Sequence, residues 1–380
     1  MSRDIFIVSN SVDELGGVAS WSHRMAELLS AEGHRVQLIG IAPAVLHKDF
    51  GDDLPYGMTT LYRERPPSAW TPRHPWQHLD ARARRQEARR SAGVREAAAR
   101  MSRMFQEARP GAVVVVTQVW AMEWVVQADL KGLQVIGMTH ESYETCRATS
   151  RYGRVKRYYA DVDRLVALTG EDADAWIRDG MNSACGIPNP LPFPLPETVP
   201  PAGKTVVSIG RLAQEKGYDL LLETWAAVVD RRPGWRLKIY GLGEEEAALR
   251  AQCTELGLDD SVEFPGRTDD VPGALAGASV FAMSSRGEGF PISLMEAMAC
   301  GVPCVSFDCA PGVREIIRDG EDGLLAPTGN TTALARQLGR LMDDRELRDT
   351  MAEKAREAIV RYAPEQVTAR WEQLFDLLDA

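Results

Sequence analysis

Short runs of apolar, strand-forming residues alternate with helix-forming stretches through the first half of this 380-residue chain. Strands that alternate with helices predict βαβ units and a mainly parallel sheet. Such sheets bind their ligands at the carboxyl ends of the strands, so functional residues are expected just after each run. The runs that we interpret as strands are Ile5–Val8, Val36–Ile41, Val113–Val116, Val135–Met138 and Arg164–Ala167.

Seven prolines lie between Pro188 and Pro201, and they divide the chain. Because proline lacks a backbone N–H and fixes φ, this density excludes a helix or a central strand and is typical of a connector. A second α/β series follows it, and the chain is long enough for two domains of ordinary size. We therefore predict two α/β domains, residues 1–188 and 189–361. The second series has candidate strands at Val206–Gly210, Leu237–Tyr240, Val262–Phe264, Val280–Met283 and Cys304–Phe307.

The chain carries 44 Lys and Arg against 54 Asp and Glu, a net charge of −10, which argues against nucleic acid as a partner. Between Arg82 and Arg103, however, eight arginines meet only Glu87 and Glu96. This alanine-rich stretch predicts a helix that is either a solvated face or a binder of anionic lipid or phosphate.

No segment is apolar over about 18 residues, and the N-terminus lacks the pattern of an export signal. The expected location is cytoplasmic, at the inner face of the membrane if the arginines bind lipid.

Signatures of several other functions fail on inspection. Gly203-Lys204-Thr205 looks like the end of a phosphate-binding P-loop, but Thr198 stands where the first glycine belongs. After the strand that ends at Tyr240, Glu246 replaces the third glycine of a dinucleotide fingerprint. The cysteines around Cys300 have neither a CxxC pair nor a nearby histidine. We therefore expect no metal site.

Residues that suit phosphate follow two of the predicted strands. Gly16 and Gly17 stand between the first strand and a helix, where exposed N–H groups and the helix dipole favour an anion. Arg211 and Lys216 follow the strand at Val206–Gly210, and two cations at the carboxyl end of a strand suit a diphosphate. Taken alone, the glycines are equally compatible with an ordinary turn and the cations with an ordinary surface.

Glu288 and Glu296 frame the most informative passage. Pro291 lies between them and is suited to start a helix that carries Glu296. Eight residues of helix span about 12 Å, more than the roughly 5 to 9.5 Å between the two carboxyls of a glycosidase. We therefore expect the carboxylates to bind two ends of one ligand, a sugar and a ribose, with phosphates at the helix N-terminus between them.

The pattern around these glutamates resembles the nucleotide-sugar motif of the family 4 retaining glycosyltransferases, also described as glycosyl transferases group 1. Gly289-Phe290-Pro291 lies between the two glutamates, and the run from Glu296 to Pro303 continues the motif. The resemblance covers about half of the chain, from Gly203 to about Leu341. Further matching segments are Gly210-Arg211-Leu212, Lys216-Gly217, Tyr240 to Gly243, Val262 to Gly266, Arg314 to Ile317 and Asp319 to Leu325.

The resemblance implies an α/β GT-B fold, in which two Rossmann-like domains face each other across a cleft. The N-terminal half would bind the acceptor, although it matches only at Gly16-Gly17 and Thr139-His140. The C-terminal half would bind the donor. A last helix, at about residues 362–380, would pack back on the N-terminal domain.

Residue roles also follow from the resemblance. His140 and Glu288 would be the catalytic residues at the donor sugar, and Glu296 would hold the ribose hydroxyls. Arg211 and Lys216 would hold the diphosphate, and the backbone near Arg267 would meet the base. Gly16 and Gly17 complete the substrate-binding set, together with the backbone N–H groups of Phe290, Pro291, Ile292, Ser293 and Leu294. No metal or other cofactor is implied, because the cations and the helix end can carry the charge of the leaving group.

The expected reaction moves a sugar from a nucleoside-diphosphate sugar to an acceptor hydroxyl, with retention and an α-linkage. Two alternatives remain, a sugar-nucleotide epimerase of the same fold and a non-catalytic nucleotide-sugar binding protein. The acceptor is a sugar, a glycan, a polyol or a lipid-linked sugar, and the stretch Pro66–Trp76 is expected to line its site. The sequence indicates neither the sugar, the base nor the oligomeric state.

Overall fold

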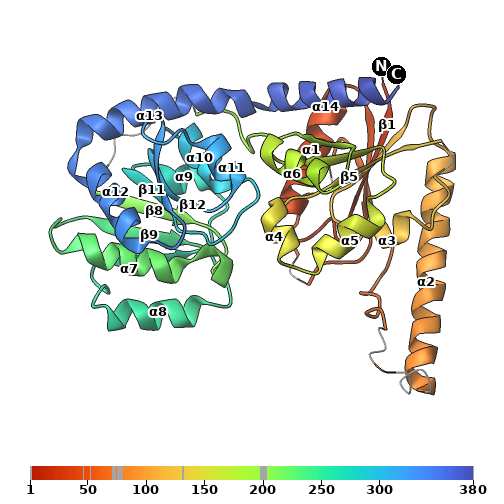
Figure 1. Ribbon diagram of the computed structural model, residues 1–380, viewed down its shortest axis with the longest axis horizontal. Coiled ribbons are helices and arrows are strands. Elements are labelled where there is room, and N and C mark those ends of the chain that lie inside the picture. Colours follow the sequence, from red (N-terminus) through yellow and green to blue (C-terminus); the bar gives the residue numbers. More distant parts are fainter. Residues whose placement is uncertain are drawn as a thin grey trace. The chain divides into compact units, whose positions relative to one another are not determined.

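The computed structural model describes residues 2–45, 47–51, 53–70, 74, 80–130, 132–196 and 203–379. The chain divides into two compact units, Met1–Ile187 with Thr368–Ala380, and Pro188–Val367. Each unit contains one parallel sheet with helices packed against it (Figure 1). The predicted α/β class is confirmed for both units. Trp76, in the expected acceptor stretch, lies outside the described residues.

The N-terminal unit has a seven-stranded sheet in the order β3-β2-β1-β4-β5-β6-β7. Strands β1 and β4 form its centre and are buried along their whole length, because helices cover both faces of a parallel sheet. This explains why their apolar runs are continuous in the sequence. The strands are β1 (Asp4–Ser9), β2 (Arg35–Gly40), β3 (Gly57–Thr60), β4 (Val113–Val116), β5 (Gln134–Met138), β6 (Arg164–Ala167) and β7 (Ala184–Gly186).

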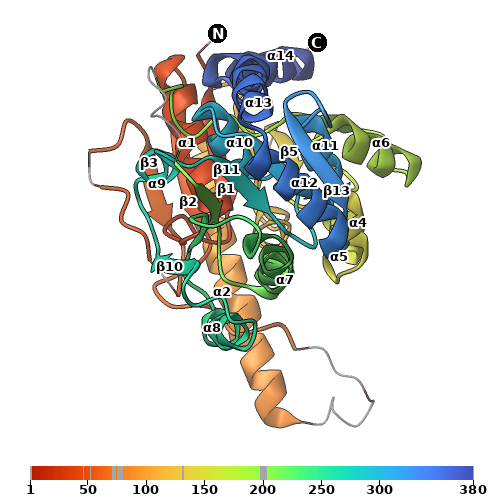
Figure 2. The same ribbon diagram turned by 90° about the vertical axis from the view of Figure 1, so that its left-hand side faces the viewer.

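The helices of this unit include one that extends away from the sheet. In α2 the first buried residue is Val94, so its N-terminal turns make no core contact, and Figures 1 and 2 show that end of the helix projecting from the unit. The helices are α1 (Gly17–Ala31), α2 (Ala81–Gln106), α3 (Met122–Val125), α4 (Tyr143–Arg147), α5 (Arg151–Tyr158) and α6 (Gly170–Arg178).

The chain ends in α14 (Pro364–Leu378), whose residues from Thr368 onward belong to the N-terminal unit. Trp371 and Phe375 on this helix are fully buried. Arg3 pairs with Asp379 and also donates to the carbonyl oxygen of Phe375. An ion pair between the Arg3 and Asp379 side chains thus connects the end of helix α14 to the residue before β1.

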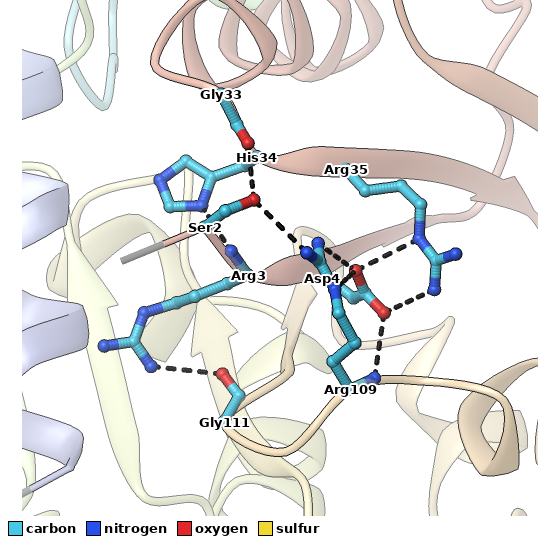
Figure 3. Close-up of polar contacts among 8 residues, drawn as sticks. All are labelled: Ser2, Arg3, Asp4, Gly33, His34, Arg35, Arg109 and Gly111. Carbon is cyan, nitrogen blue, oxygen red and sulfur yellow. Dashed lines mark hydrogen bonds and ion pairs between the residues drawn. The ribbon is translucent and has the colours of Figure 1, made fainter.

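Polar contacts around Asp4 and His34 fasten the starts of β1 and β2 (Figure 3). The Asp4 carboxylate is almost fully buried, and it accepts hydrogen bonds from the guanidinium groups of Arg35 and Arg109. Burial alone would raise the pKa of Asp4, but these bonds hold it below its usual value. The Arg3 backbone N–H donates to His34 Nδ1 at 3.0 Å. His34 Nε2 therefore carries the proton and donates to Glu372 Oε1, 2.7 Å away on α14.

The C-terminal unit has a six-stranded parallel sheet in the order β10-β9-β8-β11-β12-β13. Its strands are β8 (Thr205–Ile209), β9 (Arg236–Tyr240), β10 (Val262–Gly266), β11 (Val280–Met283), β12 (Cys304–Asp308) and β13 (Gly323–Pro327). Its helices are α7 (Tyr218–Val229), α8 (Glu246–Glu255), α9 (Val271–Leu275), α10 (Ile292–Ala299), α11 (Pro311–Ile316), α12 (Thr331–Asp343) and α13 (Arg345–Ile359).

Candidate active site

The strand order of the C-terminal sheet reverses between β8 and β11, which pair at its centre. The chain leaves β8 toward one side and β11 toward the other, and open α/β sheets bind their ligands beyond the carboxyl ends of the strands at such a reversal. Three polar side chains from the two loops meet at this point. Lys216 Nζ lies 2.6 Å from Glu288 Oε1, and the Ser285 hydroxyl donates to the same oxygen at 2.6 Å.

Gly217 allows these two loops to approach each other. Its φ of 62° lies in the left-handed region, and a Cβ at this position would lie 2.2 Å from the carbonyl oxygen of Ser284. The loops are joined further by the Ser284 hydroxyl, which donates to the carbonyl oxygen of Lys216, and by Arg286, which donates to that of Gln214. The position of Lys216 is therefore set by the backbone on both sides of it.

Arg211 does not join this cluster. Its side chain is exposed and pairs with Glu215, four residues later in the same loop. The structure thus brings Lys216 to Glu288 but does not place both predicted diphosphate cations together. That both cations bind one diphosphate stays a prediction.

Helix α10 begins at Ile292, with Pro291 in the N-cap position. Glu288 to Pro291 are not helical, so the estimate of about 12 Å, which assumed eight residues of helix between the glutamates, is wrong in its premise. The Phe290 ring is buried edge-to-face against Tyr362, and its carbonyl oxygen accepts from Asn189. These contacts hold the segment before the helix in place.

The start of α10 offers fewer N–H groups to a phosphate than the sequence analysis assumed. Pro291 has no N–H to donate, which corrects its inclusion in that set, and the Leu294 N–H already donates to the carbonyl oxygen of Pro291. The N–H groups of Phe290, Ile292 and Ser293 donate to no other described residue. Unpaired N–H groups at a helix start suit an anion, because the helix dipole adds to their partial charge.

Glu296 lies on α10, and its carboxyl group forms no hydrogen bond or ion pair with any described residue. Its side chain is largely enclosed, and burial raises the pKa of its carboxyl from 4.5 to about 7. An unpaired carboxylate with its acceptor sites unused suits a ligand that presents hydroxyl groups. Arg267, one residue after β10, pairs with Asp269, and its predicted contact with the base stays a prediction.

Gly16 and Gly17 are exposed at the start of α1, where Gly16 is the N-cap residue. A Cβ on either glycine would meet no atom within 4 Å, and the φ of Gly16 is extended. The fold of the unit therefore does not itself require glycine at these positions. A requirement for glycine would have to come from a bound molecule, so the predicted phosphate contact stays a prediction.

His140 follows β5, and its imidazole is packed against Trp21 of α1. The ring centroids are 5.2 Å apart in an edge-to-face arrangement. Burial lowers the pKa of His140 from 6.5 to about 4, so the ring is neutral at physiological pH. His140 Nε2 is enclosed and has no partner among the described residues. Sequence reasoning found His140 but missed Trp21 and Ser285, because nothing local marks a residue whose role depends on a tertiary contact.

Two absences hold for the part of the chain that the structure describes. No helix there is long and apolar enough to cross a membrane. No three His, Cys, Asp or Glu side chains come together there as a metal ion would require. Independence from metal stays a prediction.

Comparison with known families gives the assignment of the C-terminal unit. Residues 196–358 match the family described as glycosyl transferases group 1. This unit belongs to that family. Among curated relatives, an exopolysaccharide phosphotransferase of Streptomyces coelicolor is 39% identical over 219 residues, which are 56% of this chain and 23% of that protein. An uncharacterized glycosyltransferase of Haemophilus influenzae is 34% identical over 211 residues, 55% of this chain and 60% of that protein.

The matched stretch is thus less than two thirds of the length of each of these relatives. Among solved structures, a TarM mutant from S. aureus in complex with fondaparinux, α-GlcNAc-glycerol and UDP aligns with a TM-score of 0.80 at 14% identity. The alignment covers 98% of this chain and 99% of that one. The predicted GT-B fold is confirmed by this likeness.

Proposed function

We propose that this chain is a retaining glycosyltransferase of family 4, which moves a hexosyl group from a nucleoside-diphosphate sugar to an acceptor hydroxyl and forms an α-linkage. The observation that carries the proposal is the cluster of Lys216, Ser285 and Glu288 at the strand-order reversal of a group 1 glycosyltransferase unit. The cluster combines a cation for phosphate with a carboxylate for sugar hydroxyls.

The donor would bind along the start of α10. Its diphosphate would take the free N–H groups of Phe290, Ile292 and Ser293 and the charge of Lys216. Its ribose hydroxyls would donate to the Glu296 carboxylate, which has no competing partner among the described residues. UDP is the nucleotide in the TarM complex, and it is the first nucleotide to test here.

Every bond that forms or breaks in the transfer step, and the proton that moves, belongs to the substrates. The bond between the anomeric carbon and the diphosphate oxygen breaks, and a bond to the acceptor oxygen forms on the same face of the sugar. The acceptor proton passes to an oxygen of the departing diphosphate. Lys216 and the helix start stabilise the charge of that leaving group, so the chemistry does not call for a metal ion. Neutral His140 would hydrogen-bond to the donor sugar.

Peripheral contact with an anionic membrane belongs to the same proposal and rests on α2. Arg82, Arg85 and Arg89 are exposed and follow one another at helical spacing, so they share one face. None of these three forms an ion pair with another described residue. A projecting basic helix end suits an acceptor held at a lipid surface, which would place the reaction at the cytoplasmic face.

The test is a turnover assay with three outcomes. The chain is incubated with UDP-sugars, first alone and then with glycan, polyol and lipid-linked acceptors, and released UDP and products are measured. Acceptor-dependent UDP release, with an α-anomeric signal in the product by NMR, would support the proposal. A new sugar nucleotide from donor alone would identify an epimerase, and calorimetric binding without any turnover would identify a binding protein.

A further inference from the structure

Two tryptophans far apart in the sequence pack against each other, and one of them also packs against His140. The Trp21 ring lies 5.2 Å from the His140 ring and 5.9 Å from the Trp371 ring, measured between centroids. Both tryptophans are almost fully buried. His140 thus packs against Trp21 of α1, and Trp21 packs against Trp371 of α14. All three residues belong to the N-terminal unit.

The polar atoms of this contact are unusual for a core. Trp21 Nε1, Trp371 Nε1 and His140 Nε2 are each enclosed, and none has a hydrogen-bond partner among the described residues. An unpartnered buried N–H is costly, and phenylalanine would fill much of the same space without that cost. A core selected for stability alone would not be expected to place two unpartnered indole N–H groups near a histidine whose own Nε2 is also unpartnered.

The helix that carries Trp371 is fixed by contacts on both sides of that residue. Glu372 accepts from His34 at 2.7 Å, and Asp379 pairs with Arg3. Phe375 packs against Trp371 with ring centroids 5.9 Å apart. A shift of Trp371 would therefore disturb polar contacts to the residues just before β1 and β2.

We propose that Trp21 and Trp371 are positioning residues that set the ring orientation and the tautomer of His140. This inference rests on the proposed function, in which His140 meets the donor sugar. The Trp21 ring packs edge-to-face with the imidazole, and Nε2 is enclosed without a partner, whereas Nδ1 is not one of the enclosed, unpartnered atoms. The two nitrogens are then inequivalent, so one tautomer dominates and one nitrogen is presented outward. A neutral imidazole needs a single tautomer and a fixed ring orientation to make a directed hydrogen bond to a sugar hydroxyl.

The chain offers a matched control in Trp176 of α6. This tryptophan is also fully buried in the N-terminal unit, and its Nε1 also lacks a partner. Its ring contacts are with Tyr143 and Tyr152 rather than with His140. Trp176→Phe therefore reproduces the loss of an indole from the core of the unit without touching the histidine.

The experiment compares Trp21→Phe, Trp371→Phe and Trp176→Phe in the full chain. We expect the first two to lower kcat by about tenfold, because a misplaced polar group loses its directed contact, while UDP binding by calorimetry is unchanged. Trp176→Phe should keep the wild-type kcat, even if its Tm falls as much as the Tm of Trp21→Phe and Trp371→Phe. A loss of kcat in Trp176→Phe that equals the other two would overturn the proposal.

A second readout does not depend on turnover. In the wild-type chain labelled with ¹⁵N-histidine, we expect NMR to show a single tautomer of His140 between pH 6 and 8, and a mixture in the two Phe variants. Rapid exchange between both tautomers in the wild type would overturn the positioning role, whether or not those variants fold. A wild-type chain that shows one fixed tautomer but transfers no sugar would refute the proposed function and leave the positioning of His140 intact.

Discussion

Lys216 Nζ and Glu288 Oε1 lie 2.6 Å apart, although 72 residues separate them in the sequence. The two groups that we assign to the phosphate and the sugar of the donor therefore neutralise each other when no ligand is bound. A diphosphate that takes the charge of Lys216 frees a lone pair of Glu288 for a sugar hydroxyl. Binding of the two ends of the donor should accordingly be coupled.

The first prediction concerns the cations. Lys216→Ala and Arg211→Ala should each lower kcat/KM by roughly ten- to a hundredfold, because a charged hydrogen bond to phosphate contributes about 1.5 to 3 kcal/mol. The measurement is steady-state turnover of the donor. Lys204→Ala removes an exposed lysine of the same unit and serves as the control. Unchanged kcat/KM in both site variants would refute the diphosphate assignment.

The second prediction concerns Glu288. Glu288→Gln should not weaken UDP binding, because the diphosphate no longer competes with Glu288 for Lys216, but it should lower kcat severely, because the contact to the sugar is lost. Calorimetry with UDP and a turnover assay together decide the point. Equal losses of UDP binding in Glu288→Gln and Glu296→Gln would contradict the separate roles of the two glutamates.

The third prediction uses the raised pKa of Glu296. Since its carboxyl titrates at about pH 7, UDP affinity should increase from pH 6 to pH 8 as the carboxylate forms, and Glu296→Gln should remove this dependence. The folded-state pKa lies above the usual 4.5, so the folded chain binds the proton more tightly and loses stability as pH rises from about 4.5 through 7. Glu296→Gln should thus raise Tm relative to wild type at pH 8 and not at pH 4. A Tm difference that does not change with pH would contradict the assignment.

The fourth prediction concerns Asp4. Its pKa is lowered in the folded state, so its contribution to stability is present above pH 3.8 and is lost as pH falls through its folded pKa. Asp4→Asn should cost about 3 kcal/mol at pH 7, because two arginines lose a buried partner. Urea unfolding of the N-terminal transition measures it. Asp343→Asn, which breaks the exposed pair with Arg232, should cost less than about 1 kcal/mol.

The fifth prediction concerns the basic end of α2. A variant with Arg82, Arg85 and Arg89 changed to Gln should sediment less with anionic liposomes than wild type, since each arginine near such a surface contributes about 1 kcal/mol. Binding of the wild type should weaken as salt is raised. The control is a variant in which the exposed Arg236, Arg318 and Arg345 are changed to Gln, so that it has the same net charge as the test variant. Wild-type chain that stays in the supernatant at low salt would favour a soluble acceptor.

The central strands were predictable because they are buried on both faces and therefore read as unbroken apolar runs, as in β4 and β11. The edge strands β3 and β7, with the sequences GMTT and ACG, carry no such run and were missed. The candidate site residues were chosen through motif spacing, which a family resemblance can interpret, and their roles stay predictions. The pairing of Lys216 with Glu288 was not, because it depends on how two loops meet, and neither was the contact of Trp21 with His140.

Helix α14 has a consequence for the order in which the protein can be completed during synthesis. The ribosome releases the N-terminal unit first, and domains made first generally fold first. Here, however, Trp371 and Phe375 are buried in that unit but are made only after the whole C-terminal unit. Until helix α14 has been made, the apolar surface around Trp21 and His34 in the nascent N-terminal unit therefore stays uncovered. A stop codon just before Thr368 would leave the C-terminal unit whole and the first-made unit permanently open.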